Sequence, residues 1–308
     1  SRITPGEWIG AILTTCISFW AIGRYDALAH RHFGTGLPER AARTAGMLSI
    51  AFSQMGGFGL FTGTLARWRL TPGLSPVMAF RITLFVSVSF IAALGFVAGV
   101  ACFLAPPIPF ARTVAILGPL GCLAFLALAF FRPTLTVAGR RFRLPTLPAF
   151  AKCMAWAMID TLAAAGTLWI LMPDGAQVPW DVLCPAYLVA LGAALVSGTP
   201  GGVGPFELVL LTLLPGSDAE AVLGAILAFR LIYFVAPSLV AGAFLVSNRR
   251  RMGLPRDKRR PTLILAGDVP DRPLRAEHGV LAQSEARMLR AHGAELACLE
   301  LPQATIGF

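Results

Sequence analysis

Several ionisable side chains lie inside or beside apolar stretches of this sequence, where charge is costly and usually functional. They are Asp160, Glu207 and Arg230, with Arg81 at the start of one stretch and Arg67 and Arg69 at the end of another. An arginine fork can donate two parallel hydrogen bonds to a phosphate. These residues could therefore line a hydrophilic cavity that binds a polar headgroup while acyl chains stay in lipid. The alternative is a set of buried ion pairs that fix helix registry.

A segment rich in glycine and proline, SGTPGGVGPFE, ends at Glu207. Its Gly201, Gly202 and Gly204 predict a break in a helix, because glycine and proline interrupt helices. A helix restarting at Phe206 would leave free N–H groups for an anion. A carboxylate in that first turn also suits the helix dipole. The partner of Glu207 stays open between an arginine such as Arg230 and an ammonium group of a ligand.

The composition places these residues in a membrane. The 308-residue chain is 56% hydrophobic and 14% charged, with a mean hydropathy of +0.70, whereas soluble domains carry about 25% charged residues. Several apolar runs reach the roughly 20 residues that span a bilayer as a helix, and the alternation of a membrane barrel is absent. The fold class is therefore an all-α polytopic membrane protein.

The position of the charges predicts how the chain crosses the membrane. We distinguish seven apolar segments, at 7–23, 44–66, 77–104, 113–131, 149–172, 182–214 and 221–246. The net charge is +10, and the basic residues gather in the expected loops 24–43, 66–70 and 132–145 and at the start of the tail. Such loops are typically cytoplasmic and face anionic lipid, and no nucleic-acid-binding motif accompanies them. The stretches 173–181 and 215–220 carry acidic residues only and should face outside.

This assignment predicts about five full transmembrane helices and two re-entrant hairpins. Segment 182–214 has both ends outside and is broken near Gly201, whereas segment 44–66 has both ends inside and is broken in SQMGGFGLFTG. Two broken segments of opposite orientation indicate a transport site between inverted repeats. The alternative is that the glycines only let helices pack closely.

Other chemistry finds little support in the sequence. The six cysteines are scattered and make no metal-ligand pattern, and His30, His32, His278 and His292 fall in stretches expected to be solvated loops or tail. GGVG lacks the Lys-Ser/Thr ending of a phosphate-binding loop. We expect no metal and no cofactor.

Three motifs in order give the sequence a resemblance to a known family. SGTPGGVGPFE resembles the Pro-Gly-Gly-x-Gly-x-x-Glu signature of the membrane region of the bacterial lysylphosphatidylglycerol synthase/flippase family, the multiple peptide resistance factors. GRYDALAHRHFGTGLP is similar to its Tyr-Asp-x-x-Ala-Leu segment, and SQMGGFGLFTGTLARWRL to its Gly-rich stretch ending in two arginines. Gln54 or Met55 replaces the usual Asn, and Trp68 the usual Tyr. The resemblance covers about residues 10–250.

The resemblance implies a protein of the bacterial inner membrane. It implies that phosphatidylglycerol, or its aminoacyl derivative, passes through the membrane module and that the product reduces binding of cationic antimicrobial peptides. In that family a soluble domain transfers the amino acid from aminoacyl-tRNA. After Arg251 only about 57 residues remain, with two expected strands at 261–267 and 295–302 and a helix at 282–293. They are too few for a catalytic domain of typical size.

We therefore expect a transmembrane lipid-handling domain at 1–248 and a basic cytoplasmic tail at 249–308 that has the pattern of the opening of an α/β domain. The leading hypothesis is binding and translocation of anionic or aminoacylated phospholipid. The alternatives are a membrane-embedded module required for phosphatidylglycerol lysyltransferase activity, and an inverted-repeat secondary transporter with Asp160 or Glu207 as ion carrier. Enzymatic activity of the chain itself and a homo-oligomeric state stay open.

Overall fold

The computed structural model describes residues 3–71, 73–105, 109–131, 134–137, 140–143, 146–173, 178–214, 216–248, 263–266 and 296–299. The chain divides into two compact units, Ser1–Ser247 and Asn248–Phe308. The second unit contains β3 (Leu263–Ala266) and β4 (Leu296–Leu299), which pair in parallel. Both lie within the stretches where the sequence predicts strands, while the predicted helix at 282–293 lies outside the described residues.

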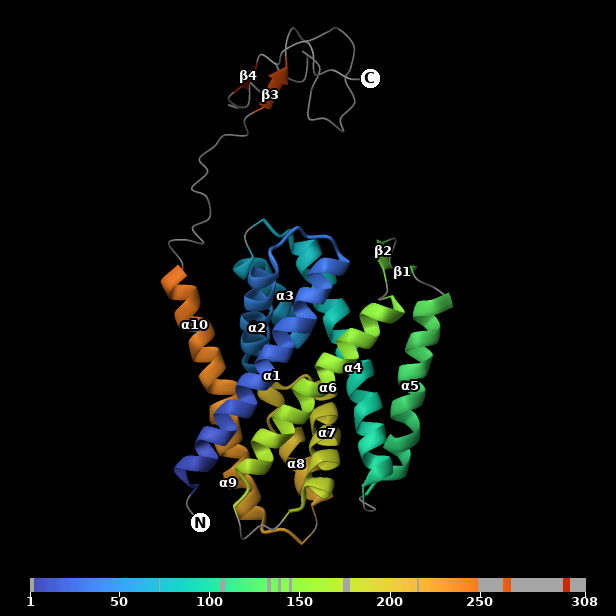
Figure 1. Ribbon diagram of the computed structural model, residues 1–308, viewed down its shortest axis with the longest axis vertical. Helices are drawn as coiled ribbons and strands as arrows, with labels where there is room; N and C mark the ends of the chain where they lie inside the picture. The colour runs from blue at the N-terminus through green and yellow to red at the C-terminus, as the bar shows by residue number, and fades with distance from the viewer. Residues whose placement is uncertain are drawn as a thin grey trace. The chain divides into compact units, whose positions relative to one another are not determined.

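The first unit is a bundle of helices with one small β-hairpin (Figure 1). Its helices are α1 (Pro5–His32), α2 (Glu39–Gly56), α3 (Gly59–Leu70), α4 (Pro76–Leu104), α5 (Ala111–Phe131), α6 (Leu147–Ile170), α7 (Trp180–Ser197), α8 (Pro205–Leu213), α9 (Ala219–Arg230) and α10 (Ala236–Asn248). A 3-10 turn, η2 (Pro200–Gly202), precedes α8, and a π-helical turn, η3 (Leu231–Val235), joins α9 to α10. The hairpin pairs β1 (Thr134–Val137) with β2 (Arg140–Arg143).

Six helices of the described chain are long and apolar enough to cross a membrane, which confirms the predicted class of helical polytopic protein. Five of them, α1, α4, α5, α6 and the continuous helix Ala219–Phe244, correspond to the five predicted spans. The sixth is α7, which was predicted to be one arm of a hairpin.

Two helix starts follow from local chemistry. Thr4 and Glu7 form a capping box at the start of α1. The Ser75 hydroxyl accepts a hydrogen bond from the Met78 N–H, and Pro76 begins α4.

Two of the predicted loop boundaries are wrong. The stretch 24–43 was expected to be a loop, yet α1 continues to His32, because nothing before Gly34 breaks the helix and its polar side chains find buried partners. The basic stretch 66–70 is the last turn of α3 rather than a loop. Basic side chains at a helix C-terminus suit the helix dipole, so charge alone does not mark a loop.

Both predicted Gly-rich breaks separate two helices that pack on each other, α2 on α3 and α7 on α8. The first break contains Gly57 and Phe58, and both have a positive φ, of 65° and 45°. The second contains Gly198, Gly201 and Gly204, with φ between 62° and 93°, a region that favours glycine. Figure 1 places the α2–α3 pair in the upper half of the bundle and the α7–α8 pair in the lower half.

The two breaks contact each other. The Phe58 N–H donates to the Gly198 carbonyl at 3.4 Å. A Cβ added to Gly57 would lie 3.0 Å from Pro200. The fold therefore brings two irregular backbone segments, far apart in sequence, into contact. The largest buried apolar cluster of the described chain includes residues of α4, α6, α7, α8 and α9.

Candidate functional site

A cavity of about 870 Å³ lies beside both helix breaks. Gln54, Gly57 and Phe58 line it from the first break, and Gly201 and Gly202 line it from the second. Irregular backbone at membrane depth is tolerated only where protein buries it or where it borders a wet cavity. The position of the cavity satisfies this requirement for both breaks together.

Large apolar side chains that are exposed on the outside of the bundle also line the cavity. Phe58 and Phe61 of the first break and α3 are 75% and 73% exposed, and Ile91 on α4 and Leu195 on α7 are about half exposed. Exposed apolar groups on a membrane helix face acyl chains. The cavity is therefore bordered, between α3, α4 and α7, by surface suited to lipid tails.

Glu207 and Arg230 form an ion pair at the second break. Arg230 donates to Glu207 Oε1 through Nε at 2.8 Å and through Nη2, and its Nη1 donates to the Gly201 carbonyl at 2.7 Å. The other carboxylate oxygen of Glu207 accepts from the Gly204 N–H at 2.8 Å. The Glu207 carboxylate thus caps α8 and binds Arg230, which is one of the two partners that the sequence left open for it.

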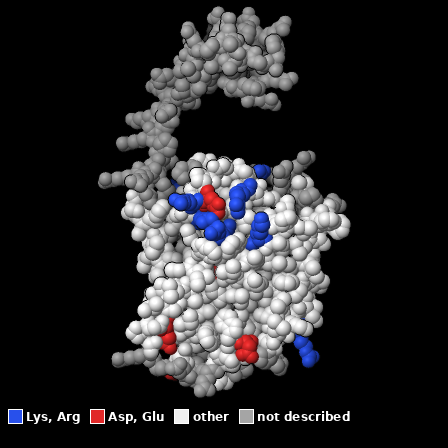
Figure 2. Space-filling model, in the orientation of Figure 1, with Lys and Arg blue, Asp and Glu red and all other residues white. Residues whose placement is uncertain are grey.

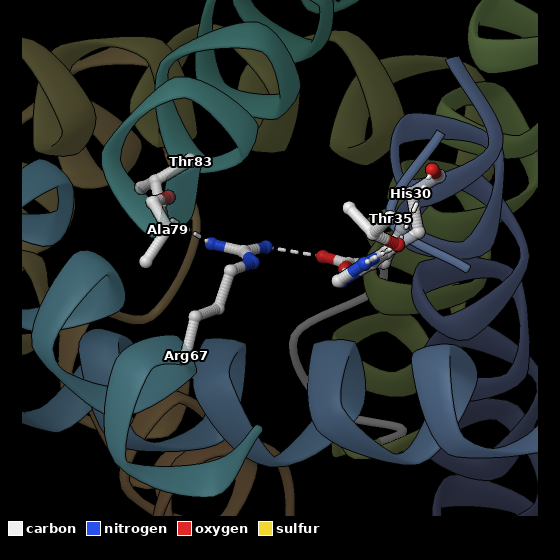
Figure 3. A network of polar contacts seen from close by, with 6 residues as sticks. His30, Thr35, Arg67, Ala79 and Thr83 are labelled. Atoms are coloured by element: carbon white, nitrogen blue, oxygen red, sulfur yellow. Dashed lines mark hydrogen bonds and ion pairs between the residues drawn. The ribbon is translucent and has the colours of Figure 1, made fainter. Parts of the chain in front are cut away.

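A second polar network joins α1, α3 and α4, and Figure 3 shows Arg67 between Thr83 and His30. Arg67 donates to Thr83 at 2.9 Å and forms an ion pair with Asp26. His30 Nε2 lies 3.6 Å from Asp26 Oδ1, and its Nδ1 is 3.0 Å from the Thr35 hydroxyl. Arg67 and Asp26 are almost fully buried, and the Arg67 Nε has no hydrogen-bond partner in the described structure. Arg67 also lines the cavity.

Asp160 on α6 is a third charged group at the cavity, and it is 4% exposed. Its Oδ1 accepts from the Ser18 hydroxyl at 2.5 Å and from the Tyr233 hydroxyl at 3.2 Å. The Ser18 and Tyr233 oxygens are 2.7 Å apart. Tyr233 belongs to the π-helical turn η3, a kind of distortion that is frequent at functional sites.

The glycines of the second break have different steric roles. A Cβ on Gly202 would lie 2.6 Å from the Cβ of Ala194, so a side chain there would push η2 away from α7. A Cβ on Gly201 would lie 3.3 Å from Arg230 Nη1. Gly204 has open space but a φ of 93°. All three positions therefore disfavour a side chain, for steric or conformational reasons.

The structure brings together Arg67, Asp160 and Arg230 around one cavity, with Glu207 bound to Arg230. Two predicted site residues lie apart. Arg69 is exposed and packs 4.9 Å from the centre of the Trp68 ring. Arg81 is half-buried on α4, does not line the cavity, and no hydrogen bond or ion pair joins it to another described residue.

Asp26 and His30 were not predicted as site residues, because both fall in a stretch whose composition predicts a loop. His30 was expected to be solvated but is 2% exposed. Their spacing of four residues, which puts them on one helix face, was the available signal. The cavity is also lined by three tyrosines, Tyr25 of the Tyr-Asp motif and Tyr187 and Tyr233, which no motif indicated.

Charged side chains lie at the two ends of the helical unit. Figure 2 shows Lys and Arg gathered around an acidic patch in the upper part, a largely white middle, and two acidic patches and one basic patch near the lower end. At the α1–α2 end, Glu39 pairs with Arg43 and lies 3.8 Å from Arg24. The hydrogen bond from Arg43 lowers the pKa of Glu39. An apolar middle between charged ends is the pattern expected for a membrane-spanning unit.

Comparison with known proteins identifies the family. The chain is 31% identical over 265 residues to the uncharacterized protein slr0712 of Synechocystis sp. (strain ATCC 27184 / PCC 6803 / Kazusa), a match that covers 79% of this chain and 80% of slr0712. It belongs to the same family as slr0712. It is also 25% identical over 249 residues to the inner membrane protein YbhN of Escherichia coli (strain K12), across 76% of this chain and 77% of YbhN. No family model matches the chain.

This chain is thus a multi-pass membrane protein of the YbhN-like family. Each match covers nearly the same fraction of this chain as of the relative, so slr0712 and YbhN are about as long as the sequence given for this chain. Neither name refers to phospholipid, flipping or lysyl transfer.

Proposed function

We propose that this YbhN-like protein binds anionic phospholipid, such as phosphatidylglycerol or its aminoacyl derivative, and moves it between the leaflets of a bacterial inner membrane. The observation that carries the proposal is the cavity, which joins two helix breaks, contains two arginines and is bordered by exposed apolar side chains. A headgroup would enter the cavity while the acyl chains remain among Phe58, Phe61 and Leu195.

The arginines give the proposal its anionic preference. Arg67 and Arg230 both line the cavity, where Asp26 and Glu207 hold their guanidinium groups. A guanidinium matches the geometry of a phosphate diester. The volume of about 870 Å³ lies within the range of roughly 300–1,000 Å³ that small-molecule sites occupy, which suits a headgroup.

The proposal includes two re-entrant hairpins. α2–α3 would enter from the side bearing the Arg24, Glu39 and Arg43 cluster, and α7–α8 from the side bearing Asp181 and Glu220. Cytoplasmic loops are enriched in basic residues, so the α2–α3 side and the tail would be cytoplasmic. Contact between Phe58 and Gly198 supports hairpins of opposite orientation that meet within the membrane.

The resemblance to the lysylphosphatidylglycerol synthase/flippase family supports the lipid-moving part of that activity. In the resemblance, amino-acid transfer belongs to a soluble domain and the lipid passes through the membrane module, to which the described helices and their cavity correspond. We therefore assign translocation rather than aminoacylation to this membrane unit. Export of aminoacylated lipid would contribute to resistance against cationic peptides.

The test is leaflet transfer in proteoliposomes. The full chain is reconstituted with a trace of headgroup-accessible fluorescent phosphatidylglycerol, and the fraction that a membrane-impermeant quencher reaches is followed over time. We expect transfer well above protein-free vesicles, faster for phosphatidylglycerol than for phosphatidylcholine. Transfer equal to that in protein-free vesicles would overturn the proposal, and equal rates for both lipids would overturn its headgroup preference.

A further inference from the structure

Three carboxylates are held within the helical unit near the cavity, and one of them differs from the other two. Asp26 forms an ion pair with Arg67, and Glu207 forms one with Arg230. Among the described residues, no Lys, Arg or His lies within ion-pair distance of Asp160, although its side chain is almost fully buried. An ionised carboxylate that is buried without a cation is strongly destabilised, so such a group takes up a counter-charge or a proton.

The surroundings of Asp160 provide hydroxyl groups and aromatic rings. Ser18 on α1 and Tyr233 on η3 donate to one carboxylate oxygen, and their own oxygens are 2.7 Å apart. The other titratable or charged groups that line this cavity are Tyr25 on α1, Tyr187 on α7, Arg67 on α3 and Arg230 on α9. α2 and α4 contribute no titratable side chain to the lining, and α5 contributes no lining residue. Both arginines are already paired with the other two carboxylates.

A metal ion is a poor occupant for this position. Hard cations require about six oxygen ligands, usually with more than one carboxylate. Asp160 is the one carboxylate among the described lining residues, and the described chain has no group of three His, Cys, Asp or Glu side chains that could hold a metal. Hydroxyl groups in a hydrogen-bonded chain can instead pass a proton to a carboxylate, and intramembrane carboxylates commonly serve as proton relays.

We propose that Asp160 is a proton-binding site and that its protonation couples lipid movement to the transmembrane proton gradient. The inference rests on the proposed function. A proton from water, relayed through the Tyr233 and Ser18 hydroxyls or taken directly from the cavity, is bound by the carboxylate, which becomes a neutral acid. The reverse step returns the proton to water on the other side, so no other reactant is needed.

The coupling follows from charge. An ionised Asp160 repels an anionic headgroup in the same cavity, whereas a neutral Asp160 does not. Proton and anionic headgroup therefore favour each other's binding, and linkage makes the effect reciprocal. A proton gradient would then drive net movement of the anionic lipid in the direction in which protons flow.

The experiment is the leaflet-transfer assay with an imposed proton gradient, combined with a pH-sensitive dye inside the vesicles. In wild-type vesicles we expect transfer of fluorescent phosphatidylglycerol to accelerate several-fold with the gradient, to lose that acceleration when a protonophore is added, and to acidify the lumen when protons flow inward. Asp160→Asn, which keeps the shape and a hydrogen-bond acceptor, should transfer at the same rate with and without the gradient. The matched control is Asp181→Asn, which changes an exposed carboxylate on α7 outside the cavity and should respond like wild type.

The outcomes separate the two proposals. If wild-type lipid transfer proceeds at the same rate with and without the gradient, proton coupling is overturned and the proposed lipid transfer stands. A gradient response that persists in Asp160→Asn also overturns the assignment. Absence of transfer under every gradient overturns the proposed function together with this inference. The wild-type measurement decides the matter even if a variant fails to fold, and Tyr233→Phe, which removes one hydroxyl, should reduce the gradient response.

Discussion

Arg230 on α9 and Glu207 on α8 are joined by an ion pair that also fixes the backbone of the second helix break. The same guanidinium donates to the Gly201 carbonyl at 2.7 Å, and the same carboxylate accepts from the Gly204 N–H at 2.8 Å. The pair therefore links α9 to the Pro-Gly-Gly turn and to the residue that precedes α8. The sequence suggested these two residues as part of a ligand site. In the structure they also hold the backbone of the break that borders the cavity.

The two roles of Glu207 predict a graded loss of stability. Glu207→Gln keeps an oxygen that can cap the Gly204 N–H but loses the charge, whereas Glu207→Ala loses both contacts. We expect Glu207→Gln to cost about 1–2 kcal/mol and Glu207→Ala about 1 kcal/mol more. Thermal unfolding in detergent measures the order, with the exposed Glu220→Gln as control. Equal midpoints for the two Glu207 variants would show that the cap contributes nothing.

The buried pair of Asp26 and Arg67 predicts strong non-additivity. Each single alanine variant leaves the partner charge buried and unpaired, at a cost of about 3–5 kcal/mol. The double variant Asp26→Ala/Arg67→Ala removes both charges and should be more stable than the sum of the single losses predicts. A double-mutant cycle of unfolding free energies measures this. Additive losses would mean that the two side chains act independently.

Close packing of α1 on α2 predicts that Gly46 tolerates no side chain. A Cβ there would lie 2.3 Å from the Asp26 Cβ, so the helices would have to separate. Gly46→Ala should destabilise the protein by about 1–3 kcal/mol. Gly121 on α5 has nothing within 4 Å of an added Cβ, so Gly121→Ala should leave the unfolding midpoint unchanged or slightly raised. A normal midpoint for Gly46→Ala would contradict the α1–α2 packing.

The proposed orientation predicts the accessibility of engineered cysteines. Ala219 at the start of α9 and Ala41 on α2 are both exposed and lie near opposite ends of the helical unit. In intact spheroplasts, a membrane-impermeant maleimide should label Ala219→Cys, whereas Ala41→Cys should need permeabilisation. The reversed pattern would invert the topology and place the tail outside.

The fold was largely predictable because its signals are physical constraints of the membrane. Long apolar runs predict spans, and both Gly-rich breaks were located from residues that disfavour helix. The end of α1 was not predictable in this way. Asp26 and His30 look like loop residues by composition, and only partners outside α1, Arg67 on α3 and Thr35 in the loop after α1, make them part of a buried helix face.

The candidate site was partly predictable for the same reason. Charges within apolar runs pointed to Asp160, Glu207 and Arg230, and the ion pair between the last two was one of the stated options. Arg69 and Arg81 carried the same signal but lie outside the cavity, because the direction of a side chain depends on how its helix is rotated in the bundle. The tyrosines around Asp160 have no distinctive spacing, so only the three-dimensional arrangement gathers them.

The central claim is that lipid crosses through the cavity between the two breaks, and a cavity-filling variant tests it most directly. Ser87 on α4 lines the cavity, whereas Phe103 on the same helix is 79% exposed and does not. In the leaflet-transfer assay, Ser87→Trp should slow transfer of fluorescent phosphatidylglycerol by about tenfold or more, a barrier increase of about 1.4 kcal/mol, while Phe103→Trp keeps the wild-type rate. Wild-type transfer by correctly folded Ser87→Trp would contradict a route through this cavity.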